Sequence, residues 1–205
     1  DGKQIAISAK AGGQDAIFIT DAETGAYKKL TWGIKAIQSV QWSPDGTKLA
    51  FIGSKDEQTD IYTYELESKT LAKVTDDVFS DDTPKWSPDS KSLYFISDRG
   101  SITSADTKSS DIDMWDYNYQ KNDIYKINID TKVIERITND SQNGKTSLAI
   151  SSDASKMLYV SDKNGIGNLY EMNLSNKSSR PLTNSLQEIT QISLSQDDSK
   201  VLFGT

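Results

Sequence analysis

The chain has 205 residues and a net charge of −7, with hydrophobic residues at only 35%. This composition suits many short strands joined by solvated turns better than a dense helical core. The negative charge argues against a surface for nucleic acid or anionic membranes, because both need clustered lysine and arginine. No apolar run approaches the roughly 20 residues of a transmembrane helix.

The sequence contains neither histidine nor cysteine. Their absence excludes Ser-His-Asp and Cys-His catalysis, disulfides and thiolate metal sites within this chain. We therefore expect no catalytic residue and no cofactor in these 205 residues.

A strand–turn–strand unit recurs along the chain. It is clearest in the segments WSPDGTKLAF at 42–51 and WSPDSKSLYF at 86–95, and weaker copies lie at 150–159 and 194–203. A fifth copy, which lacks its start, opens the chain at 1–6. The turn aspartates are separated by 44, 44, 64 and 44 residues. A fixed period predicts a repeat architecture, and the longer third unit predicts an insertion of about twenty residues.

The turn in each unit has a chemical basis. In the SPDG segment at 43–46, proline presets φ, aspartate can bond its own backbone, and glycine takes the positive φ that returns the chain. This chemistry accounts for the repeated aspartates without a functional role. Trp42 and Trp86 share their repeat position with apolar residues in the weaker copies, which predicts packing between units.

Short extended segments fill the rest of each unit. They alternate in hydrophobicity or form short apolar runs bounded by turn residues, which indicates β strands, and no segment has a convincing helical period. The expected strands are 5–7, 15–19, 27–31, 37–42, 49–52, 60–66, 71–75, 84–86, 93–100, 123–129, 133–138, 147–150, 157–162, 168–174, 180–183, 189–194 and 201–203. Four antiparallel strands in roughly 40–45 residues make one propeller blade.

The predicted fold class is therefore all-β, a β-propeller built from four-stranded antiparallel blades. We expect residues 1–205 to form a single propeller segment of about four blades, a section of a six- or seven-bladed propeller. A four-bladed ring with a spare strand is the alternative. The expected units are about 1–42, 43–86, 87–150 with an insertion at 101–122, 151–194 and, in part, 195–205.

These residues resemble the TolB-type propeller repeat. The shared signature is a Trp-Ser-Pro-Asp-Gly turn, a Leu-Ala-Phe strand, an Asp-Ile-Tyr strand and a closing apolar residue followed by threonine. It lies at 42–52, 60–62 and 74–75 in the second unit and at 86–99, 123–125 and 137–138 in the third. The fourth unit departs from it, with Ser152 for the proline and Ala154 for the glycine. Such repeats specify a fold and occur with many functions.

The resemblance implies several functions. The first is a non-catalytic scaffold for protein–protein interaction in the bacterial cell envelope, periplasmic or otherwise exported, with a lipoprotein or an adjoining domain as partner. The second is the accessory propeller of a tricorn-like or prolyl-oligopeptidase-like peptidase whose catalytic domain lies outside these residues. The third is a carbohydrate-binding or carbohydrate-active propeller with a carboxylate pair, although the lyases that resemble this family rely on a metal and histidine.

The insertion at 101–122 is the strongest candidate for a binding site, because long loops often carry function. The link that it interrupts is expected on the same face as the connections at 76–82 and 139–145. Aromatic rings interleaved with carboxylates suit a protein or glycan partner. The candidate partner-binding residues are Asp111, Asp113, Trp115, Asp116, Tyr117 and Tyr119 in the insertion, together with Trp32, Asp81 and Asp82.

Two other interpretations of the insertion stay open. The first is a loop that folds its own rings over the edge of the blade and binds nothing. The second is a calcium site made by Asp111, Asp113 and Asp116, whose spacing resembles part of a loop for hard cations. The segment lacks the glycine and the terminal bidentate glutamate of such loops.

Overall fold

The computed structural model describes residues 2–54, 58–113, 121–140 and 144–205 of the chain. In these ranges the elements are β strands and one short 3₁₀ helix, η1 (Ser109–Asp111), so the all-β prediction is confirmed. No helix within the described ranges has the length and apolar character needed to cross a bilayer.

The strands form a row of antiparallel sheets that follows the repeat. Their bounds are β1 (Gln4–Lys10), β2 (Asp15–Asp21), β3 (Tyr27–Leu30), β4 (Ala36–Trp42), β5 (Lys48–Ser54), β6 (Thr59–Glu65), β7 (Thr70–Lys73), β8 (Asp81–Trp86), β9 (Ser92–Ser97), β10 (Asp123–Asn128), β11 (Ile134–Arg136), β12 (Lys145–Ile150), β13 (Lys156–Ser161), β14 (Asn168–Asn173), β15 (Ser179–Pro181), β16 (Gln191–Leu194) and β17 (Val201–Gly204).

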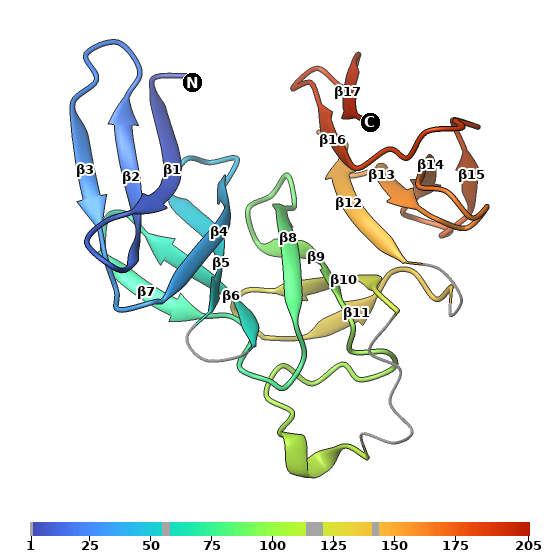
Figure 1. Ribbon diagram of the computed structural model, residues 1–205, viewed down its shortest axis with the longest axis horizontal. Helices are drawn as coiled ribbons and strands as arrows, with labels where there is room; N and C mark the ends of the chain where they lie inside the picture. Colours follow the sequence, from blue (N-terminus) through green and yellow to red (C-terminus); the bar gives the residue numbers. More distant parts are fainter. Residues whose placement is uncertain (1, 55–57, 114–120, 141–143) are drawn as a thin grey trace.

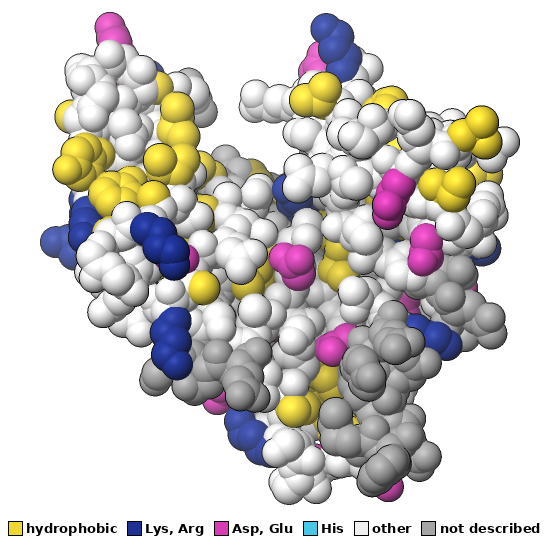
Figure 2. Space-filling model, viewed as in Figure 1, with side chains coloured by type: hydrophobic (Ala, Val, Ile, Leu, Met, Phe, Trp, Pro, Cys, Tyr) yellow, Lys and Arg dark blue, Asp and Glu magenta, His cyan; other side chains and the backbone are white. Residues whose placement is uncertain are grey.

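Three of the sheets have four strands in chain order, β4–β7, β8–β11 and β12–β15. A three-stranded sheet, β1–β3, precedes them, and the β16–β17 hairpin follows. Figure 1 shows the sheets in an arc, with β1–β3 and the β16–β17 hairpin at its two ends. In the same view, Figure 2 shows the surface hollowed between these ends. The three four-stranded antiparallel sheets, stacked in chain order, confirm the prediction of propeller blades.

The second strand of each blade explains the short apolar runs of the sequence. In β5, Leu49 and Phe51 pack with residues of the β1–β3 sheet, whereas Ala50 and Ile52 pack with residues of the β8–β11 sheet. Successive side chains of a strand point to opposite faces. A strand between two neighbouring blades therefore buries both faces, and the alternation between apolar and polar residues disappears. Strands β9 and β13 repeat this arrangement with the sheets on either side of them.

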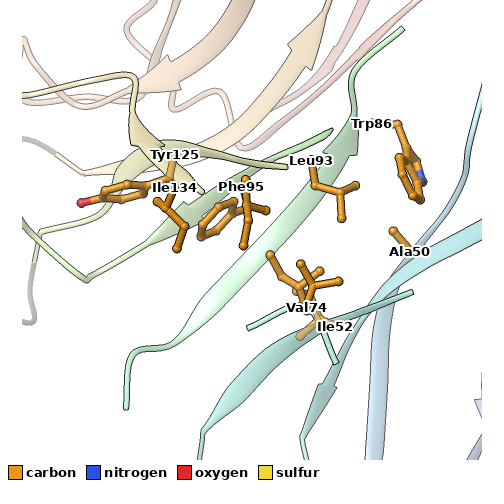
Figure 3. Close-up of a cluster of buried hydrophobic side chains, with 10 residues drawn as sticks. Ala50, Ile52, Val74, Trp86, Leu93, Phe95, Tyr125 and Ile134 are labelled. Atoms are coloured by element: carbon orange, nitrogen blue, oxygen red, sulfur yellow. The ribbon is translucent and has the colours of Figure 1, made fainter. Parts of the chain in front are cut away.

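Figure 3 shows the cluster between the β4–β7 and β8–β11 sheets, in which Ile52 and Val74 of one blade face Leu93 and Phe95 of the next. Trp86, which is only 7% exposed, belongs to the same cluster, and its Nε1 donates a hydrogen bond to the carbonyl of Gln41 at 3.4 Å. The repeated tryptophan position therefore packs one blade against its neighbour, as the sequence predicts.

The turns repeat one hydrogen-bond pattern. In the turn at 43–48, the Ser43 hydroxyl donates to Asp45 Oδ1 at 2.6 Å and accepts from the Lys48 N–H at 2.9 Å. Asp45 Oδ1 also accepts from the Thr47 N–H at 2.9 Å. The same contacts recur in the later turns, at 87–92, 151–156 and 195–200. The aspartates therefore serve the turn, as expected.

The fourth turn position holds glycine in the turn at 43–48 and other residues in the later turns. Gly46 has φ +72°, and Ser90, Ala154 and Asp198 adopt similarly positive values. Two of these replacements connect neighbouring turns. Ser90 Oγ accepts from the Asp45 N–H at 3.2 Å, and Asp198 Oδ2 accepts from the Ser152 N–H at 2.8 Å. A side chain that bridges to the previous blade offsets part of the strain of the left-handed conformation.

The turn at 151–156 gives a prediction for acid stability. Hydrogen bonds from the Ser151 hydroxyl, the Ser155 N–H and the Ser155 hydroxyl lower the pKa of Asp153 from 3.8 to about 2. A lowered pKa contributes stability that is present above pH 4 and is lost as the pH falls through about 2. We expect Asp153→Asn to be less stable than the wild type at pH 6, with the difference shrinking between pH 4 and pH 2. Urea unfolding followed by tryptophan fluorescence checks this, and a difference independent of pH contradicts it.

Candidate functional site

The insertion is built onto the connection that precedes β8. The Asp76 N–H donates to the carbonyl of Ala105 at 2.8 Å, and the Val78 N–H donates to the carbonyl of Thr107 at 3.0 Å. Lys108 Nζ reaches the carbonyl of Asp76 at 2.8 Å. Figure 1 shows the insertion with η1 projecting beyond the ends of the β8–β11 strands. The expectation that the insertion lies beside 76–82 holds for its described part, and main-chain hydrogen bonds fix it there.

A buried arginine lies beneath this platform. Arg99 follows β9, is 0% exposed, and forms ion pairs with Asp77 at 3.0 Å and Asp81 at 2.6 Å. It also donates to Ser97 Oγ and to the carbonyl of Ser104 in the insertion, both at 3.1 Å. The guanidinium therefore ties together β9, the 76–82 connection and the start of the insertion.

Aromatic rings surround the Arg99 guanidinium. Its central carbon lies 5.4 Å from the ring of Phe79, 5.1 Å from Phe95 and 5.7 Å from Tyr125. The Tyr125 hydroxyl donates to the carbonyl of Gly100 at 2.6 Å, which closes the loop over the arginine. Cation–π contacts of this kind suit a desolvated arginine, whose planar charge is weakly hydrated.

The electrostatics of the cluster follow from burial and pairing. Burial raises the pKa of Asp77 to about 6, and the nearby Arg99 only partly offsets this. Burial by itself would lower the pKa of Arg99. The negative charges of Asp81 and Asp77 and their hydrogen bonds outweigh the effect of burial, so the pKa is raised. Arg99 is therefore a fixed positive charge, and Asp77 is the partner whose pKa responds to burial.

A cavity of about 320 Å³ opens beside this cluster, between the β4–β7 and β8–β11 sheets. Its walls combine carboxylates, amides and hydroxyls with the side chains of two isoleucines. The described lining residues are Gln38, Ile52, Thr59, Ser80, Asp81, Asp82, Ile96, Asp98 and Asn122. Most of them lie at the strand ends that carry the insertion, so the cavity and the insertion share one face. We call this face, with its cavity, the loop face.

The predicted site residues have different positions. Asp82 is exposed and lines the cavity, whereas Asp81 is 0% exposed and its Oδ1 is held by Arg99. Asp111 and Asp113 are exposed at η1, and Asp111 Oδ2 accepts from the Lys108 N–H at 3.0 Å. Trp32 is half-buried and stacks on Phe51, with ring centroids 5.3 Å apart. It lies away from the other candidates, between the first two sheets.

The remaining predicted residues, Trp115, Asp116, Tyr117 and Tyr119, lie outside the described residues. The calcium alternative includes Asp116 and so falls partly outside as well. Among the residues that the structure does describe, no three acidic, histidine or cysteine side chains come together as ligands for a metal ion.

Sequence reasoning missed the buried Arg99 and Asp77 of the site. It also missed two residues that line the cavity, the half-buried Asp98 and the exposed Asn122. A buried arginine is rare because arginine is mostly exposed in proteins. The available signals were the acidic run at 76–82 and an Asp-Arg-Gly segment at 98–100 without a counterpart in the fourth unit.

Solved structures similar to this chain have the same architecture. TolB from Acinetobacter baumannii matches with a TM-score of 0.76 and 23% identity over 98% of this chain and 46% of that protein. A putative TolB from Agrobacterium tumefaciens matches with a TM-score of 0.70 and 24% identity over 89% of this chain and 62% of that protein. The chain therefore spans about half of the length of these proteins.

A peptidase has a related structure. The puromycin-hydrolyzing peptidase of Mycobacterium tuberculosis matches with a TM-score of 0.66 and 15% identity over 98% of this chain and 35% of that protein. No curated protein sequence matches the chain. The sequence profile of the TolB β-propeller domain matches residues 1–105, which hold the clearest copies of the repeat. The chain belongs to the TolB β-propeller family.

Proposed function

We propose that this chain is a non-catalytic propeller module that presents the loop face to a protein partner, in an exported protein of the bacterial cell envelope. The observation that carries the proposal is the anchoring of the insertion. The carbonyls of Ala105 and Thr107 accept hydrogen bonds from the N–H groups of residues 76 and 78. These bonds hold in place the segment that leads to the exposed Asp111 and Asp113. A preorganised loop loses less conformational entropy on binding than a free one.

The aromatic content of the insertion supports a protein partner in particular. Trp115, Tyr117 and Tyr119 alternate with acidic and amide residues in the sequence DMWDYNY at 113–119. Tryptophan and tyrosine dominate the energetics of protein interfaces because they offer large contact areas at low entropic cost. In this proposal these rings provide the contact area, and Asp82, Asp111 and Asp113 orient polar groups of the partner. A lipoprotein or an adjoining domain fits this role.

The likeness to a puromycin-hydrolyzing peptidase favours a second candidate, an accessory propeller of a peptidase. In that case the loop face would contact a catalytic domain of the same polypeptide instead of a separate protein. The sequence that flanks these residues in the full-length protein separates the two candidates.

The test is partner capture from a bacterial envelope extract with a shortened insertion. Residues 109–120 are replaced by a glycine–serine linker, and 101–108 are kept because Ser104, Ala105 and Thr107 support Arg99 and the 76–78 segment. We expect at least a tenfold loss of the captured protein, identified by mass spectrometry, if this segment contains interface hot spots.

The matched control is Tyr27→Ser, which removes a ring that is 67% exposed on the first sheet. This variant should capture the partner as the wild type does. Equal capture by the shortened chain would remove the insertion as the binding element.

A further inference from the structure

We propose that the cavity of the loop face binds a positively charged side chain, arginine or lysine, of a protein partner. This proposal rests on the proposed function, because it names the chemistry that the partner brings to that face. The cavity lies between two blades, is about 320 Å³ in volume, and is lined by three carboxylates, Asp81, Asp82 and Asp98.

Asp81 supplies the first argument. Asp81 is one of the residues that line the cavity, its side chain is fully buried, and its Oδ1 accepts from Arg99 at 2.6 Å. Among the described residues, Asp81 Oδ2 is buried and has no hydrogen-bond partner. A buried carboxylate oxygen without a donor is costly, since it has lost its water and gained nothing in return. A donor that enters the cavity from a partner would remove this penalty.

The balance of charge supplies the second argument. Arg99 is shared between Asp77 and Asp81, so its single positive charge is already matched by two carboxylates. Asp82 and Asp98 add negative charge to the same cavity. Burial also raises the pKa of Asp98, although the carboxylate accepts from the Ser80 N–H at 3.0 Å. Among the described residues that line the cavity there are three aspartates and no lysine or arginine, so a cation from a partner would complement them.

The shape of the lining favours a side chain over a metal ion. Across the described parts of the chain, carboxylates do not gather in threes at metal-binding distance. Ile52 and Ile96, both buried, add apolar surface to the cavity. A long aliphatic stem with a charged end matches this combination, because lysine and arginine bury the stem and keep the head among polar groups.

Titration with N-acetyl-arginine methylamide, followed by ¹H–¹⁵N NMR of the whole chain, tests the proposal. We expect saturable shifts of the side-chain amides of Gln38 and Asn122 and of the Ser80 N–H. The citrulline analogue, which has the same shape without the charge, should not shift them at equal ionic strength. Because the probe is an isolated amino acid, the result is independent of whether any partner protein is captured.

A charge-removing variant sharpens the test. Asp82→Asn with Asp98→Asn keeps the oxygens that accept from Thr83 and Ser80 but removes two negative charges. We expect about tenfold weaker binding of the arginine probe, as the loss of two partly exposed charge pairs implies. The matched control, Asp130→Asn, changes an exposed aspartate after the far end of β10 and should bind as the wild type does.

Several outcomes would overturn the inference. The first is that the citrulline analogue shifts the same resonances as much as the arginine probe does. The second is that the double variant binds the arginine probe with unchanged affinity. The third is that the arginine probe shifts only resonances outside the cavity. Calcium chloride that shifts the same resonances when the arginine probe does not would point to a metal ion in its place. Capture of a partner by the loop face without binding of the arginine probe would uphold the proposed function and reject this inference.

Discussion

Replacing Arg99 with methionine is expected to lower the free energy of unfolding by about 3–5 kcal/mol, because it leaves buried carboxylates without their counter-charge. Arg99, Asp77 and Asp81 have side chains that are 0% exposed, and both carboxylates bond the guanidinium directly. Methionine fills much of the same space, so the lost free energy of unfolding reflects mainly the missing positive charge. Urea unfolding at pH 8, followed by tryptophan fluorescence and circular dichroism, measures it.

The pH dependence of this loss gives a further check. Burial already raises the pKa of Asp77 to about 6 with Arg99 present, and removal of the guanidinium raises the pKa further. A raised pKa in the folded state contributes stability at low pH that is lost as the pH rises through it. The penalty of Arg99→Met should therefore be smaller at pH 5 than at pH 8.

Two companion variants separate charge from packing. Arg99→Lys keeps the charge but cannot bond both carboxylates with a planar fork, so we expect a stability between those of the wild type and Arg99→Met. The triple variant Arg99→Met, Asp77→Asn, Asp81→Asn removes all three charges and should recover much of the loss, since the uncompensated carboxylates are gone. If Arg99→Met unfolds at the same urea concentration as the wild type, the cluster does not stabilise the fold.

We expect Phe51→Ala to lower the free energy of unfolding by about 3–5 kcal/mol, the usual cost of deleting a fully buried aromatic ring. Phe51 is 0% exposed and lies in the cluster between β1–β3 and β4–β7. Its ring stacks on Trp32 at 5.3 Å and on Tyr62 at 5.6 Å. Truncation leaves a cavity at the contact between two blades, where few other groups can move in to fill it.

Phe51→Ala should also weaken the packing of the first sheet, β1–β3, against the second sheet, β4–β7. In a repeat protein the stability is approximately a sum of the units and the interfaces between neighbours. Amides of β1–β3 should therefore exchange with solvent faster in Phe51→Ala, while amides of β12–β15 keep most of their protection. Phe203→Ala, at a ring that is 48% exposed, is the control and should change stability little. Uniform loss of protection over all sheets would contradict uncoupling.

The sequence by itself determined the repeat, the turns and the strands. Each of these leaves a local pattern in the sequence. The turn needs only Ser43, Asp45 and Gly46 in order, and the apolar runs of β5 and β9 mark strands that are buried on both faces. A unit that repeats every 44 residues also shows which segments are equivalent. The all-β propeller class and the position of the insertion beside 76–82 could be predicted on this basis.

The buried arginine and the cavity were decided by the tertiary structure alone. Arg99 meets Asp77 and Asp81 across 22 and 18 residues of chain, in a loop connection that carries no periodic signal. The cavity takes its lining from several segments of two blades, which meet only when the blades pack. The sequence shows charged residues there, and charge usually means solvent. Only packing determines which charges lose their water, and that desolvation creates the cost of the Arg99 cluster and underlies the proposed binding of a cation in the cavity.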